Sequence, residues 1–240
     1  YGNYNHGIVS KDDLKIVSGT ITVQAVNDGI KGRDSISILN PSIVITTGGD
    51  GMQANNEEDL EKGTIKIEGG SIYITADLDG IQAETTLVIS GGELTISAGG
   101  GSANGAAHWE GMDRRNDFGA ATTETAVSAK SLKAGVLVTI SGGTFEIDAA
   151  DDTIHSNDTI EISGGEFQLS SGDDGAHADT LLSISGGDLE AARGVRRTAG
   201  HDDGRAFGGK LGQGLPHRGI GLVARAGDEA RLGARQAQAE

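Results

Sequence analysis

A unit of 22 residues repeats along this chain, and each copy is marked by Ser-Gly-Gly or a close variant between two short apolar alternations. The last residue of the marker falls at Gly19, Pro41, Gly70, Gly92, Gly143, Gly165 and Gly187. Successive markers are 22, 29, 22, 51, 22 and 22 residues apart, so two units carry insertions of 7 and 29 residues. A fixed period of this length is typical of one supersecondary unit stacked on copies of itself. The repeat therefore predicts a solenoid, in which a residue type kept in one slot becomes a column on the surface.

Apolar residues alternate strictly on both sides of the marker, as in Ile36 and Ile38 before it and Ile43 and Ile45 after it. This period of two predicts two short half-buried strands in each unit. A third short strand is expected after an Asp-Gly corner, with Ile30 and its equivalents pointing inward. Three strands in about 22 residues predict an all-β fold, a single-stranded parallel β-helix. The crossover rule for parallel strands makes its hand right.

The repeat predicts one elongated domain over residues 1–191, with an insertion at about 103–130. The chain opens inside a unit, so we expect a further segment upstream, and no signal peptide or anchor is readable. Residues 192–240 are rich in Gly, Ala and Arg and lack the repeat. Two explanations remain open for this tail: a flexible or weakly helical appendage, or out-of-frame translation. We favour the second, because the pattern breaks in the middle of a unit.

Charge is distributed unevenly along the chain. Residues 1–191 hold 30 Asp and Glu against 10 Lys and Arg, within a chain of net charge −16. A body this acidic disfavours nucleic acid and anionic membrane surfaces as partners, and favours cations or neutral ligands. The chain has no cysteine, which excludes disulfides and thiolate metal sites. No apolar run is long enough for a transmembrane helix.

An aspartate column is the least ordinary feature of the repeat. It comprises Asp28, Asp50, Asp79, Asp152 and Asp174, and the preceding residue is also acidic at Asp151 and Asp173. Carboxylates on coils ~4.8 Å apart repel by roughly 3.5 kcal/mol at an effective dielectric of 20. Asp-Gly is also a good turn former, which explains single aspartates but not the doubled pairs. Because Lys and Arg are scarce on this body, the column predicts bound Ca²⁺, foremost at the doubled pairs.

A second polar column lies on the third strand, between its two inward positions, and is expected to face solvent. It comprises Lys31, Gln53, Gln82, Lys133, His155 and His177, with the two histidines stacked. Such a column can hydrogen-bond sugar hydroxyls. It can also be an ordinary solvated face, or, less well, a zinc site without a clear third ligand type.

The long insertion holds the only tryptophan, Trp109. Long loops on rigid scaffolds often carry function, and an exposed indole can stack on a sugar ring. The alternative is that Trp109 anchors the loop on the coil.

Catalytic motifs are absent from the sequence: it has no Ser-His-Asp order, P-loop or zinc-protease pattern. A calcium-assisted polysaccharide lyase needs a base near the metal, and Lys133, Lys31 and Lys130 are the lysines near the aspartate corners. Hydrolysis by two carboxylates stays open. The same aspartates recur in most units, however, which is expected of structural metal sites more than of one catalytic centre.

Four motifs resemble a bacterial family of secreted carbohydrate-binding domains first known from cellulose-degrading clostridia. They are residues 27–34 (NDGIKGRD), 76–84 (ADLDGIQAE), 99–102 (GGGS) and 150–156 (ADDTIHS). The resemblance covers roughly residues 5–190 and implies a pectate-lyase-like right-handed β-helix with calcium between coils. It also implies binding of cellulose and acidic plant polysaccharide without cleavage, outside the cell or at its surface. Thr153 departs from the corner glycine of the motif.

The sequence thus predicts calcium-dependent, non-catalytic binding of plant cell-wall polysaccharide, namely cellulose or polygalacturonate. The candidate calcium ligands are the seven aspartates of the column and its doubled pairs, and the candidate sugar contacts are Trp109, Lys133, His155, His177 and Gln82. Two alternatives remain, a calcium-dependent pectate lyase and a structural adhesin stalk.

Overall fold

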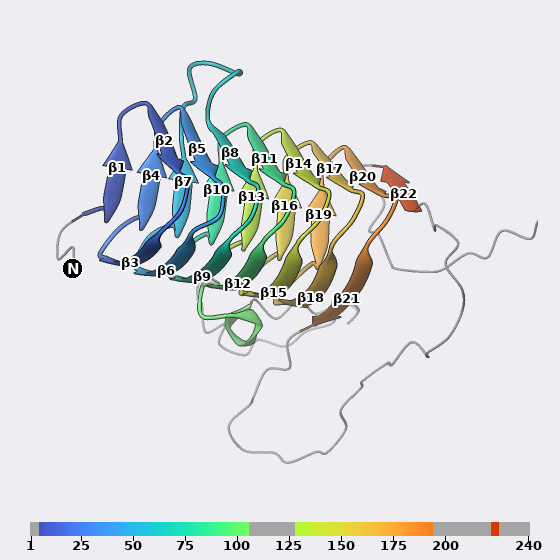
Figure 1. Ribbon diagram of the computed structural model, residues 1–240. Coiled ribbons are helices and arrows are strands. Elements are labelled where there is room, and N and C mark those ends of the chain that lie inside the picture. The colour runs from blue at the N-terminus through green and yellow to red at the C-terminus, as the bar shows by residue number, and fades with distance from the viewer. Residues whose placement is uncertain (1–4, 106–127, 194–221, 226–240) are drawn as a thin grey trace, which may run out of the picture.

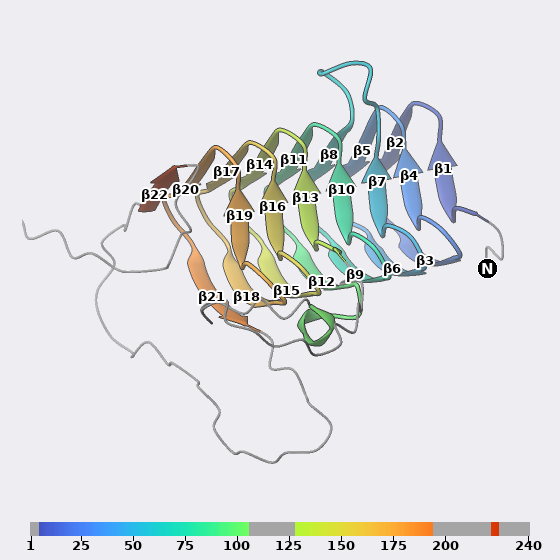
Figure 2. The same cartoon turned by 180° about the vertical axis from the view of Figure 1, so that it is seen from behind.

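The computed structural model describes residues 5–105, 128–193 and 222–225. Within these ranges the chain is all-β apart from one 3-10 turn, η1 (Ser102–Asn104). The strands fall into three sheets, and consecutive strands pass from one sheet to the next (Figures 1 and 2). The arrangement is that of a β-helix-like solenoid, and we call each set of three consecutive strands a coil.

Sheet A contains the short third strand of each repeat. Its members are β1 (Ile8–Ser10), β4 (Ile30–Gly32), β7 (Met52–Ala54), β10 (Ile81–Ala83), β13 (Leu132–Ala134), β16 (Ile154–Ser156) and β19 (Ala176–Ala178). All neighbours in it are parallel.

Sheet B contains the strand that precedes each marker. Its members are β2 (Asp13–Ile16), β5 (Ser35–Ile38), β8 (Thr64–Ile67), β11 (Thr86–Ile89), β14 (Leu137–Ile140), β17 (Thr159–Ile162), β20 (Leu181–Ile184) and β22 (Leu222–Arg225). The last of these comes from the tail and pairs antiparallel with β20, whereas the other neighbours are parallel.

Sheet C contains the longer strand that follows each marker. Its members are β3 (Thr20–Ala25), β6 (Ser42–Thr47), β9 (Ser71–Ala76), β12 (Glu93–Ala98), β15 (Thr144–Ala149), β18 (Glu166–Ser171) and β21 (Asp188–Arg193). Strand β21 extends the paired structure two residues past the predicted domain end at 191.

The strand register follows the repeat of the sequence. Ile8 pairs with Ile30, 22 residues away, while Ile81 pairs with Met52 and Leu132 across the two insertions. The predicted return to register at Leu132 is therefore confirmed. Equivalent residues of successive coils lie side by side, which is the condition for surface columns.

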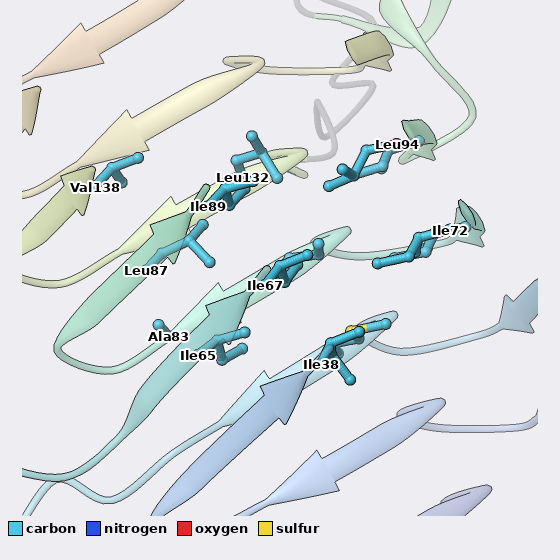
Figure 3. Packing of buried hydrophobic residues seen from close by; sticks show 14 of the residues in the cluster. Ile38, Ile65, Ile67, Ile72, Ala83, Leu87, Ile89, Leu94, Leu132 and Val138 are labelled. Atoms are coloured by element: carbon cyan, nitrogen blue, oxygen red, sulfur yellow. The ribbon is translucent and has the colours of Figure 1, made fainter. Parts of the chain in front are cut away.

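One continuous core runs through the stack. The predicted inward positions are buried in the central coils, as the aliphatic side chains of Figure 3 illustrate. Two aromatic members, Phe145 and Phe167, stack with ring centroids 4.5 Å apart. Because each coil shares its apolar face with its neighbours, burial in the central coils depends on the stack and not on a single coil.

The marker residues form the corner between sheets B and C, which we call the glycine corner. Its last glycine has a positive φ in six coils, from +101° at Gly187 to +115° at Gly143. Residues with a side chain rarely adopt this backbone conformation, which explains why glycine fills the slot. Pro41 takes the same place in the second coil, where the backbone must turn differently because proline fixes φ near −65°.

Candidate functional site

The aspartate column lies at the corner between sheets C and A, which we call the aspartate corner. Its slot is filled, coil by coil, by His6, Asp28, Asp50, Asp79, Lys130, Asp152 and Asp174. Lys130 stands between Asp79 and Asp152, since its carbonyl accepts from Gly80 and its own N–H meets Asp79. The column is therefore two shorter runs of aspartate separated by a lysine.

One oxygen of each inner aspartate bonds the backbone of the next coil. In each case Oδ1 of the aspartate accepts a hydrogen bond from the backbone N–H of the residue that fills the slot in the next coil. The pairs, acceptor first, are Asp28 and Asp50 (3.2 Å), Asp50 and Asp79 (3.0 Å), Asp79 and Lys130 (2.8 Å), and Asp152 and Asp174 (3.1 Å). These four aspartates are buried, at 4–6 % exposure. Charge-assisted bonds of this kind satisfy the carboxylates and tie adjacent coils together.

The second oxygen meets the polar column of sheet A. Asp28 Oδ2 lies 3.2 Å from Lys31 Nζ, and Asp79 Oδ2 lies 2.9 Å from Lys133 Nζ. The column folds back onto the corner, so the expectation that it faces only solvent is wrong. Lysines are scarce on this body, as predicted, but Lys31 and Lys133 both lie at this corner and reach its carboxylates.

Histidines replace these lysines at the C-terminal end of the corner. His155 Nδ1 lies 2.9 Å from Asp152 Oδ2, and His177 Nδ1 lies 3.1 Å from Asp174 Oδ2. The two rings stack with centroids 5.3 Å apart, as predicted. Burial alone would lower the pKa of His177, but the hydrogen bond to Asp174 and the nearby carboxylates raise it above its ordinary value.

Asp50 is the aspartate of this corner whose recorded partner is neutral. Its Oδ2 accepts from the Gln53 amide at 2.6 Å. Burial, followed by the charge of Asp79, raises the pKa of Asp50 to about 6. Below about pH 6 this carboxyl is therefore mostly protonated in the folded protein, and the column then carries one negative charge less.

The doubled aspartates bring carboxylates of two coils together. Asp151, Asp152 and Asp173 each offer an oxygen, and these atoms lie within 4.8 Å of one another. Asp152, Asp174 and His177 form an overlapping group at the same spacing. Hard oxygen donors at this spacing suit Ca²⁺, which takes ligands at 2.3–2.6 Å.

A protein cation already approaches the first of these groups. Lys130 Nζ lies 2.6 Å from Asp151 Oδ2, and the Ser128 hydroxyl donates to the same oxygen at 2.7 Å. Burial would raise the pKa of Asp151, but these two hydrogen bonds lower it below the usual range. A single lysine leaves the doubled pairs with excess negative charge, so the donor set fits a hard cation.

The predicted sugar contacts are partly assembled. Gln82, Lys133, His155 and His177 follow one another along sheet A, and Gln53 Nε2 donates to Gln82 Oε1 at 3.3 Å. All four are half-buried and have a polar atom bonded to the aspartate corner or to the column itself, while Nε2 of His155 and of His177 meets Asn157 and Asp179 respectively. Trp109 lies outside the described residues.

An open groove follows the glycine corner and was not predicted as a site. It has a volume of about 1370 Å³ and passes along the marker residues from Gly19 to Gly187. Its edge on sheet C is the first residue of each strand, an exposed column of Thr20, Ser42, Ser71, Glu93, Thr144, Glu166 and Asp188. The repeated marker was the available signal, since consecutive glycines in five of the seven coils leave most of this corner without side chains.

Comparison with known proteins gives the chain a family. A family model described as carbohydrate-binding domain-containing protein matches residues 1–175. The chain belongs to this family. The match covers the strands from β1 to β18, the aspartate corner, and the glycine corner as far as its marker at Gly165. No curated protein and no solved structure matches the chain. No helix in the described ranges is long and apolar enough to cross a membrane.

Proposed function

We propose that this carbohydrate-binding domain binds plant cell-wall polysaccharide without cleaving it, and that calcium at the doubled aspartates supports binding of acidic chains. The observation that supports this proposal most is that carboxylates from two coils lie close together beside a polar column, in a chain of a carbohydrate-binding family. Cellulose and polygalacturonate are the proposed ligands. We also propose that the solenoid is right-handed and that the protein acts outside the cell or at its surface.

Asp151, Asp152 and Asp173 would hold the ion, with Asp174 beside them. Bound there, Ca²⁺ would neutralise the carboxylates and attract uronate groups that an acidic protein otherwise repels. Asp28 and Asp79 are less suited to a metal, since each pairs one oxygen with the next coil and the other with a lysine. The calcium proposal therefore concentrates on the C-terminal part of the corner.

The lyase alternative is weakened by the contacts of its candidate base. Lys133 Nζ lies 2.9 Å from Oδ2 of the buried Asp79. The amine would have to leave this carboxylate before it could reach a sugar proton. The stalk alternative assigns no glycan affinity, and the family match favours the carbohydrate-binding reading over it.

The test is a glycan array probed with and without calcium, followed by titration of polygalacturonate. We expect calcium-dependent binding of polygalacturonate and weaker loss of neutral glucan binding on chelation. Asp173→Asn should weaken calcium-supported binding by about tenfold, because one ligand charge is lost. Glu161→Gln removes an exposed carboxylate from sheet B and serves as the control. Equal loss of acidic and neutral glycans on chelation would contradict the bridging role, and absence of all glycan binding would contradict the function.

A further inference from the structure

We propose that the glycine-corner groove binds a neutral, unbranched glycan in an extended conformation, lying along the solenoid axis with about one sugar on each coil. This inference rests on the proposed polysaccharide binding and adds the surface, the chain class and the orientation. It assigns neutral chains to a different edge of sheet C from the one that carries the aspartates.

The shape of the groove suits an extended chain. It is continuous over the marker residues of seven coils, and its floor is backbone, because glycine occupies most of the lining positions at the corner. Coils stack at ~4.8 Å, which is close to the length of one pyranose ring in an extended chain. Successive sugars would therefore meet equivalent protein groups on successive coils.

Backbone N–H groups supply hydrogen-bond donors along this floor. Among the described residues, no partner is recorded for the N–H groups of Gly91 and Gly92, nor for the equivalent glycine pairs 69–70, 142–143 and 164–165. These glycines are half-buried, so their amides depend on solvent or a ligand. The carbonyl side is different, since Gly70 O accepts from Glu93 of the next coil at 2.8 Å.

The sheet C edge supplies groups that complement sugar hydroxyls. Ser and Thr hydroxyls both donate and accept, and the carboxylates of Glu93, Glu166 and Asp188 accept. The lining residues include three acids and no lysine or arginine. A polyuronate would meet like charge in this groove without a counter-ion, so the groove favours neutral chains.

The experiment is a titration of the whole chain with cellohexaose in the presence of a calcium chelator, followed by backbone amide NMR. We expect the largest shifts at the marker glycines, such as Gly92, Gly143 and Gly165. The glycines of the aspartate corner, Gly29 and Gly51, serve as internal controls and should not move. Shifts confined to the aspartate corner or to sheet A would overturn the groove assignment.

Side-chain variants test the same groove without altering its floor. Ser71→Ala and Thr144→Val each remove one exposed hydroxyl and should weaken cellohexaose binding about fivefold, the usual effect of one net hydrogen bond. Thr139→Val, on the outer face of sheet B, is the matched control and should leave affinity unchanged. Equal effects of Thr144→Val and Thr139→Val would overturn the assignment.

The outcomes separate this inference from the function on which it rests. Binding of polygalacturonate with calcium, but of no cellohexaose, would overturn the groove and leave polysaccharide binding intact. Failure of every glycan to bind would overturn both.

Discussion

The two corners that flank sheet C are built from one repeat but are finished in opposite ways. At the aspartate corner, aspartate side chains bond the backbone of the next coil at four coil boundaries, and buried carboxylates meet lysine, glutamine or histidine. At the glycine corner, glycine leaves most of the floor without side chains, and the N–H groups of paired glycines lack partners in the described part of the chain.

This contrast separates stability from recognition. A corner whose polar atoms are already bonded contributes cohesion between coils, and it has spare ligand capacity only where acids are doubled. A corner with unpaired donors and an open groove can offer hydrogen bonds to a ligand. The comparison therefore predicts that changes at the aspartate corner alter folding, and that changes at the glycine-corner edge alter binding.

The largest expected effect comes from filling the aspartate corner. A Cβ on Gly51 would lie 2.4 Å from both Gly80 O and Ile74 Cγ2. Gly51→Ala should therefore lower the free energy of unfolding by about 3 kcal/mol, as overpacking does. Chemical denaturation measures this loss.

The same slot provides its own control two coils later. Ser131 fills it with a buried hydroxyl that has no recorded partner among the described residues. Ser131→Ala removes an unsatisfied polar atom and should be neutral or stabilise by about 1 kcal/mol. A loss as large as that of Gly51→Ala would contradict the packing account of this corner.

The next effect depends on pH. The pKa of Asp50 is raised to about 6 in the folded protein, above the unfolded value of about 3.9. The folded state therefore binds this proton more tightly, and the contribution of Asp50 to stability falls as pH rises from about 4 to about 6. Asp50→Asn should recover somewhat under ~3 kcal/mol above pH 7, at about 1.4 kcal/mol per pKa unit, and nothing below pH 4, as judged by unfolding at several pH values. A gain independent of pH would contradict the titration of Asp50.

A smaller effect is expected at the ion pair of the same corner. Lys133→Ala leaves the Asp79 carboxylate without its cation and should cost about 1 kcal/mol. A double-mutant cycle with Asp79→Asn measures the coupling.

The same variant tests catalysis. If the wild type released unsaturated product from polygalacturonate and Lys133→Ala did not, the proposal that the protein does not cleave its ligand would be wrong.

The smallest effect on stability is expected at the glycine corner. Glu93 is an exposed residue of the groove edge. Glu93→Gln should change the free energy of unfolding by less than about 0.5 kcal/mol, the usual range for surface changes. A larger loss would show that the groove edge also holds the coils together.

Much of the fold was predictable from the sequence because period and burial are coupled. The apolar alternation that contains Ile36 and Ile38 predicted where the strands lie. The fixed spacing of the repeat predicted that the aspartates share one corner. The return to register at Leu132 and the stack of His155 on His177 were predicted and are confirmed.

The site was less predictable, because a period of two distinguishes only inward from outward. The sequence pattern could not show that the side chains of Lys31 and Lys133 turn back toward the carboxylates of the aspartate corner. It also missed Lys130 in the aspartate slot, since the insertion before it breaks the count. Unpaired amides at the glycine corner have no side-chain signal at all, so only the coordinates of neighbouring coils expose them.

Competition between two glycans tests the division between the corners most directly. Cellohexaose would be titrated into the protein in calcium, with and without saturating oligogalacturonate. The account predicts the same cellohexaose affinity in both cases, because neutral and acidic chains occupy different edges of sheet C. Mutually exclusive binding would contradict it.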